Sequence, residues 1–399
     1  MRPTRHSQLS LLPEEFGEFD AVDLSAYQTA AESTDRLKKG GIGPPLLGLF
    51  GEAGSLLSAL KKKQRDKASF NKYNDAVYEE LGDCLWYFSL IASRSGLQLP
   101  VLAQRMFRDF EDWDEVDPSF GSFGDIQGRM DTEVSETEFN SRALALAGYV
   151  GDLINDYRIG ALEGNRDKVS AHLVDVFKAL VAAADAAGVA LDEAARLNLK
   201  KIFSRWPHSA VYPARFDKAM PENERFPDIL EFSISEEVIG SKACVVQRYS
   251  GEKIGDSLTD NKAEKDDYRF HDVFHLAFLT HLGWSPVLRA LLKKKRKSQP
   301  GVDEDQDGAR AILIEEGVAT FIFGRGLELG LFKGIDQVDY DLLKFVQEFV
   351  KGYEVEQCEL WQWERAILDG FRVFRSLVET RRGRVIADIV SHKLDFKEL

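Results

Sequence analysis

The sequence predicts a mainly helical protein, with two similar four-helix units followed by a mostly helical C-terminal domain that carries a small β-hairpin. Long stretches with a 3.6-residue period, and only 12 prolines in 399 residues, predict the helices. The pattern GLFGE at residues 48–52 recurs as GYVGD at residues 148–152, which favours an internal duplication over a chance likeness of two helical hairpins. The predicted parts cover residues 23–115, 138–206 and 230–399.

Each element is predicted from its period and from the residues that end it. Capping residues and Gly or Pro breaks bound the helices of the first unit, which are expected at 23–40, 46–63, 71–94 and 99–113. In the C-terminal domain, the alternating segments EFSISEE and KACVVQRYS predict the hairpin. Helices follow there at 268–283, 309–329, 338–352 and 355–380.

Charge and composition exclude several classes of protein. Asp and Glu number 66 and Lys and Arg 52, so the net charge is −14, which argues against broad binding to nucleic acid or to an anionic membrane. No apolar run is long enough for a membrane helix. The three cysteines lie far apart without a C-x-x-C pair, which is typical of a reducing compartment. We therefore expect a cytoplasmic protein.

Three carboxylates stand on otherwise apolar helices. Glu52 is the only charged residue in LLGLFGEAGSLLSAL, and Asp83 is the only one in the apolar run after Glu80. Glu80 and Asp83 are three residues apart and share one helix face, which two antiparallel helices could bring beside Glu52. Converging carboxylates repel one another, and a divalent cation resolves that repulsion. An all-oxygen site suits Mg²⁺ or Mn²⁺, with Glu79 as a further candidate ligand.

A plainer interpretation places Glu79, Glu80 and Asp83 on a solvated helix face. Lys61 and Lys62, about two to three turns after Glu52, also have two interpretations. They could form a rim that binds phosphate, or they could simply complement the dipole at the C-terminal end of their helix.

These segments carry a family resemblance. AYQTAAESTDRL, LGLFGEAGSLLSALKKK and YEELGDCLWYFSLIA resemble the MazG-like all-α nucleoside triphosphate pyrophosphohydrolases. That family has E-x-x-E on one helix and E-x-x-D on the next, and its four carboxylates hold Mg²⁺. The resemblance implies catalytic and metal-binding roles for Glu52, Glu80 and Asp83, and places Tyr87 in the nucleotide pocket. The second Glu of the first motif is replaced by Ser55.

The resemblance also has consequences for the second copy and for assembly. The second copy keeps Asp152 and Asp175, whereas Asn155 and His172 fill the other two positions of the motif. Because the family forms dimers of such bundles, the tandem copies would be an internal pseudo-dimer, and a homo-oligomer of the whole chain is expected. The implied partners are nucleoside triphosphates, with no membrane and no direct nucleic-acid contact.

A second cluster of candidate ligands lies in the C-terminal domain. The segment YRFHDVFHLAFLTH places His271, Asp272 and His275 at helical spacings, and Glu315 with Glu316 lies on the next predicted helix. Mixed His and carboxylate ligands predict a second metal or phosphate site. Interior histidines with satisfied hydrogen bonds and one salt bridge are the alternative.

Three functions remain open from the sequence. The first is Mg²⁺-dependent hydrolysis of ribo- or deoxyribonucleoside triphosphates to a monophosphate and pyrophosphate. The second is a non-catalytic nucleotide-binding or sensor protein, in which Ser55 marks lost catalysis. The third is a separate metal-dependent hydrolase site in the C-terminal domain, with the repeats as a scaffold.

Overall fold

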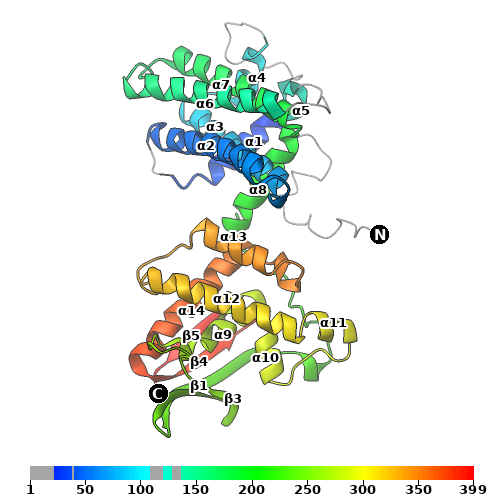
Figure 1. Cartoon of the computed structure of the whole chain (residues 1–399), viewed down its shortest axis with the longest axis vertical. Coiled ribbons are helices and arrows are strands. Elements are labelled where there is room, and N and C mark those ends of the chain that lie inside the picture. Colours follow the sequence, from blue (N-terminus) through cyan, green and yellow to red (C-terminus); the bar gives the residue numbers. More distant parts are fainter. Residues whose placement is uncertain (1–21, 38–39, 108–119, 128–135) are drawn as a thin grey trace. The chain divides into compact units, whose positions relative to one another are not determined.

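The chain divides into two compact units. The computed structural model describes residues 22–37, 40–107, 120–127 and 136–399. The first unit ends at Trp206 and the second begins at Pro207, and both are drawn in Figure 1. The predicted boundary at residue 115 lies outside the described residues, as does the end of the helix predicted at 99–113.

The described part of the first unit is all-helical. Capping residues fix some helix ends. The Asp23 side chain accepts a hydrogen bond from the Ala26 N–H at the start of α1, and the backbone of Gly188 ends α7 with a left-handed φ of 65°. The helices are α1 Leu24–Ser33, α2 Gly43–Asp66, α3 Tyr73–Arg94, α4 Leu99–Arg105, α5 Phe123–Ile126, α6 Glu136–Arg158, α7 Arg166–Ala187 and α8 Leu191–Arg205. A 3₁₀ turn at Lys67–Ser69 follows α2.

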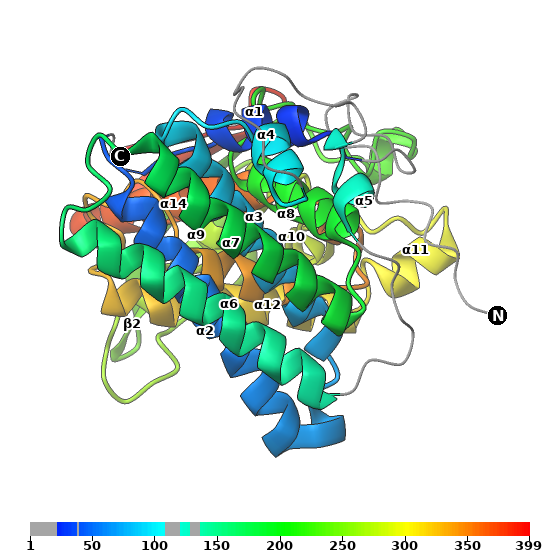
Figure 2. The same cartoon turned by 90° about the horizontal axis from the view of Figure 1, so that it is seen from above.

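Two helical hairpins share one core in this unit. α2 packs along α3, α6 packs along α7, and α2 also contacts α6; Figure 2 shows α2, α6 and α7 running side by side. The rings of Phe88 on α3 and Phe177 on α7 are 4.9 Å apart at their centres, and both side chains are fully buried. The segments predicted as two copies therefore bury their apolar faces against each other within one compact unit.

Helix α8 approaches α3 unusually closely at Gly82. A Cβ at Gly82 would lie 2.8 Å from the Ala194 carbonyl oxygen and 2.9 Å from the Cβ of Asn198. Only glycine fits this contact, and the side chains of α8 therefore reach the residues that follow Gly82 on α3.

The second unit combines helices with an antiparallel sheet in the order β3-β2-β1-β4-β5. Its strands are β1 Ile229–Ile239, β2 Lys242–Tyr249, β3 Glu252–Leu258, β4 Arg382–Asp388 and β5 Lys393–Lys397. Its helices are α9 Asp272–Leu282, α10 Pro286–Leu291, α11 Pro300–Asp305, α12 Ala309–Glu328, α13 Tyr340–Phe349 and α14 Leu360–Thr380. Short 3₁₀ turns lie at Glu222–Glu224, Tyr268–Phe270 and Glu354–Gln357.

The small hairpin predicted for this unit is part of a five-stranded sheet, so the sequence predicted too few strands. β1 and β2 form the expected hairpin, with Ile234 opposite Gln247, but Ile234 also pairs with Gly383 on β4. The prediction missed β3, which pairs locally with β2, and it missed β4 and β5. β4 joins β1 from about 150 residues along the chain, and β5 pairs with β4. Such long-range pairing leaves no local trace in the sequence.

Helix α9 lies at the centre of the second unit. It packs against α14 and the strands β4 and β5, and every one of its residues is buried. α9 covers only 11 residues, and across the described ranges no helix combines the length and apolarity needed to cross a bilayer. Polar side chains on such a buried helix must find partners inside the protein.

Candidate metal centre

The three carboxylates predicted from the sequence meet in the first unit. Glu52 projects from α2, and Glu80 and Asp83 from α3. Each offers an oxygen that lies within 4.8 Å of the others, and all three residues are half-buried. One divalent ion could therefore contact all three.

Burial and mutual repulsion make these groups reluctant to ionise together. Burial, then the neighbouring carboxylates of Glu52 and Asp83, raises the pKa of Glu80 to about 8. Burial, then Asp83, raises the pKa of Glu52, and a hydrogen bond joins the Glu52 and Glu80 side chains. Without a cation, a proton shared by Glu52 and Glu80 relieves the repulsion, and a metal ion at the same place would do so at neutral pH.

A lysine from a distant helix, which the sequence motifs did not predict, joins the cluster. The Nζ of Lys201 on α8 lies 2.5 Å from both oxygens of Asp83 and 3.7 Å from Glu79. Four carboxylates and one ammonium group leave a formal charge of −3 when all are ionised. The lysine therefore offsets only part of the negative charge.

Asn198 completes the contacts of Asp83. Its amide nitrogen donates to Asp83 at 2.7 Å, and its amide oxygen accepts from the Tyr27 hydroxyl at 3.3 Å. The Tyr27 contact thus fixes which end of the amide faces Asp83. Asn198 and Lys201 are three residues apart on α8, and this spacing was the sequence signal that could have placed both on one helix face. The close approach of α8 at Gly82 brings that face to Asp83.

Tyr87 and Glu79, two further predicted residues of the first unit, lie on α3 with Glu80 and Asp83. Burial, then Glu52 and Asp83, raises the pKa of Tyr87. Its ring packs against α2 so closely that a Cβ at Gly48 would lie 2.1 Å from it. Glu79 stands outside the three-carboxylate cluster, across Lys201. The role of Tyr87 in binding a nucleotide stays a prediction.

Lys61 and Lys62 are exposed on the same helix as Glu52. They follow it by nine and ten residues, which is roughly 13–15 Å along the helix axis. The cation nearest the carboxylates is Lys201 instead. A role for Lys61 and Lys62 in binding phosphate stays a prediction.

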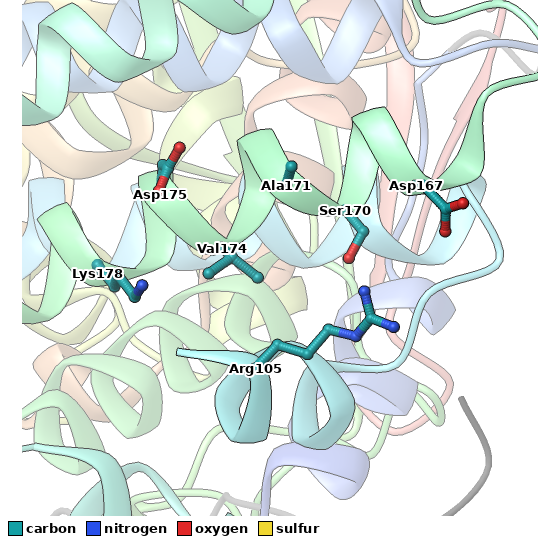
Figure 3. A pocket seen from close by; sticks show the side chains of 7 residues that line it. All are labelled: Arg105, Asp167, Ser170, Ala171, Val174, Asp175 and Lys178. Atoms are coloured by element: carbon teal, nitrogen blue, oxygen red, sulfur yellow. The ribbon is translucent and has the colours of Figure 1, made fainter. Parts of the chain in front are cut away.

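The second copy brings no comparable group together within the described ranges. Asp152 and Asn155 are exposed on α6, and His172 pairs with Asp156 at 2.7 Å rather than with Asp175. Asp175 lines an open hollow of about 260 Å³ between α7 and α4, shown in Figure 3. Arg105 from α4 extends along this hollow, and no residue of the carboxylate cluster lines it.

The predicted residues of the second unit also converge. Ligand atoms of His271, His275 and Glu316 lie within 4.8 Å of one another. His271 directly precedes α9, His275 lies on α9, and Glu316 lies on α12. Asp272 adjoins them, with an oxygen 3.1 Å from Nε2 of His271. Glu315 instead binds the opposite ring nitrogen of His275, at 2.8 Å.

Two comparisons with known proteins found a match. Residues 211–399 match the family model described as the MazG C-terminal domain. The Gene 37 protein of Mycobacterium phage L5 is 34% identical over 87 residues, which are 21% of this chain and 74% of that protein. No solved structure matches the chain.

Proposed function

Since the chain belongs to the MazG family, we propose that its first unit is a Mg²⁺-dependent nucleoside triphosphate pyrophosphohydrolase. Membership in the family suggests a nucleotide pyrophosphohydrolase-type function in general terms. The substrate, the metal and the first unit as the active part are our proposal. The observation that supports it is the convergence of Glu52, Glu80 and Asp83 within 4.8 Å.

The donor set fits Mg²⁺ or Mn²⁺. All three groups offer carboxylate oxygen, which hard divalent cations prefer. With Glu79 included, four carboxylates face the single ammonium group of Lys201, so a formal charge of −3 remains for a cation to offset. When bound, the ion would polarise phosphoryl oxygens and offset the charge that develops on them.

The remaining chemistry falls to this chain's own residues. Glu52 or Glu80 would take the proton of a water that attacks in line, splitting the bond between the α- and β-phosphates. Their hydrogen-bonded pair can carry a proton near neutral pH, because the pKa of Glu80 is raised to about 8. Lys201 and Asn198 hold the Asp83 carboxylate in place and act as positioning residues.

Pyrophosphate release tests the proposal. A panel of ribo- and deoxyribonucleoside triphosphates with Mg²⁺ should include at least one that yields monophosphate and pyrophosphate. Asp83→Asn removes a charge aimed at the ion and should lower kcat about 10²- to 10³-fold. Asp152→Asn, on the exposed face of α6, is the matched control and should leave the rate unchanged. Equal rates in all three proteins would refute the assignment.

A non-catalytic nucleotide sensor is the second candidate. Two observations favour it: Ser55 stands where the family has a carboxylate, and Lys201 holds both oxygens of Asp83. In that case a nucleoside triphosphate should raise Tm and be recovered intact after prolonged incubation with Mg²⁺. Recovery of monophosphate and pyrophosphate in amounts exceeding the protein would exclude the sensor.

A further inference from the structure

We propose that the second unit binds a first-row transition-metal ion through Nε2 of His271, Nε2 of His275 and the carboxylate of Glu316. This site is separate from the carboxylate cluster of the first unit and does not depend on the function proposed for it. Zn²⁺ is the ion that the donors suit best, because imidazole nitrogen with carboxylate oxygen is a common zinc set and a poor one for Mg²⁺.

The distances between donors match such an ion. Nε2 of His271 lies 3.5 Å from one oxygen of Glu316, and Nε2 of His275 lies 3.5 Å from the other. Ligands held roughly 2.1 Å from a tetrahedral ion are about 3.4 Å apart. The three groups thus need little movement to become ligands.

Hydrogen bonds on the far side of each ring set its tautomer. Nδ1 of His271 lies 2.9 Å from the carbonyl oxygen of Tyr268, which can only accept, so Nδ1 carries the proton. Nδ1 of His275 lies 2.8 Å from Glu315. In a neutral ring, the lone pair is then on Nε2, facing the proposed ion. Histidine ligands in metal sites are commonly oriented in this way.

Glu315 is held firmly in its supporting role. Its side chain is fully buried, and it also accepts from the Ser285 hydroxyl at 2.7 Å and the Val287 N–H at 2.8 Å. Together with His275 these donors occupy both carboxylate oxygens. The result is a carboxylate–histidine pair that points Nε2 toward Glu316.

An unsatisfied nitrogen gives independent evidence for a ligand. His275 is fully buried, and its Nε2 makes no hydrogen bond in the described structure. Leaving a buried polar atom without a partner costs about 1–3 kcal/mol, so such an atom calls for an explanation. A metal ion between Nε2 and Glu316 would supply the missing partner.

The surroundings leave one side of the site open. The ring of Tyr268 stacks on that of His271, with centres 4.2 Å apart, and Asp272 offers a carboxylate 3.1 Å from the same imidazole. The Glu316 side chain, by contrast, is 38% exposed. A site with protein ligands on one side and solvent on the other can keep a position for water, as catalytic zinc sites do.

The competing explanation is a proton in place of the metal. Burial lowers the pKa of His275, but the carboxylates of Glu315 and Glu316 outweigh it and raise this pKa well above its ordinary value. A protonated His275 would then be a buried ion pair without a metal function. A titration with Co²⁺ distinguishes a metal site from a protonated His275.

The test uses the full chain carrying Asp83→Asn, which impairs the first cluster. The protein is stripped with a chelator, dialysed and titrated with Co²⁺, whose visible absorption reports nitrogen ligation. About one equivalent should bind and be displaced by Zn²⁺. Glu316→Ala should weaken binding at least about 100-fold, whereas Glu328→Ala, an exposed glutamate on the same helix, should not change it.

Folding must be monitored alongside binding. Circular dichroism should show that Glu316→Ala stays folded, since its side chain is partly exposed, and His275→Gln serves as the second variant. Failure to bind Co²⁺ in the folded parent would overturn the proposal, and so would a Co²⁺ affinity in both Glu316→Ala and His275→Gln that equals the parent's. The first result would assign His275 to the protonated ion pair.

Discussion

The two clusters of this chain are built in opposite ways. In the first unit, Glu52, Glu80 and Asp83 converge from two helices, and Lys201 of a third offsets part of their charge. In the second unit, the proposed donors are the Nε2 atoms of His271 and His275 with the carboxylate of Glu316, and a buried carboxylate contacts one ring from behind. The first arrangement suits a hard cation that binds weakly and exchanges, and the second suits a softer ion held more tightly.

Removing the ammonium group should have the largest effect on stability. Lys201→Met leaves Asp83 without its cation, and without Mg²⁺ we expect the free energy of unfolding to fall by about 3 kcal/mol. Mg²⁺ should raise the stability of this variant more than that of the parent, because the ion then neutralises the charge of Asp83 in place of the lysine. Thermal unfolding with EDTA and with Mg²⁺ measures both.

Lys178→Met, which changes an exposed lysine on α7, is the control and should cost less than about 0.5 kcal/mol. If Lys201→Met were as stable as this control, the ion pair would not be a main support of the first cluster, and the contrast between the clusters would weaken.

The contact at Gly82 should have the next largest effect. Gly82→Ala drives a methyl group into the backbone of α8 at 2.8 Å, which we expect to cost about 2 kcal/mol and to displace Lys201 from Asp83. Gly54→Ala, where a Cβ meets nothing within 4 Å on the same bundle, should instead stabilise the helix by about 0.5–1 kcal/mol. Urea unfolding of the pair measures the difference.

Adding a carboxylate at position 55 should change metal binding by a smaller amount. Ser55→Glu places a fourth carboxylate one turn after Glu52, and should tighten Mg²⁺ binding about tenfold, or 1.4 kcal/mol. Calorimetric titration of the parent and the variant measures the change. Unchanged or weaker affinity would show that Ser55 does not face the ion.

The pH dependence of the metal-free protein tests the shared proton in the first unit. The folded pKa of Glu80 is raised from 4.5 to about 8, so its contribution to stability is complete below pH 4.5 and is lost as the pH rises through about 8. Tm in EDTA should therefore fall across this window, and Glu80→Gln should reduce the fall. Saturating Mg²⁺ should reduce it as well, and a Tm that stays level in EDTA would argue against the shared proton.

Sequence patterns found the groups that lie close together in the chain. Glu80 and Asp83, or His271 and His275, share a helix face by spacing alone, and the apolar surroundings of Glu52 marked it as buried. Lys201 was missed because its partner Asp83 lies 118 residues away, and strands β4 and β5 were missed because they pair across the whole second unit. The matched family model covers the second unit, whereas the resemblance read from motifs lies in the first.

The close packing of α8 on α3 joins the two predicted copies at one carboxylate. The segment predicted as the second copy supplies, from its last helix, the only cation found among the described contacts of Asp83. A fragment ending before Leu191 would keep all three carboxylates yet lack Asn198 and Lys201. Helix α8 is therefore needed to hold Asp83, whether or not its own segment carries a metal ligand.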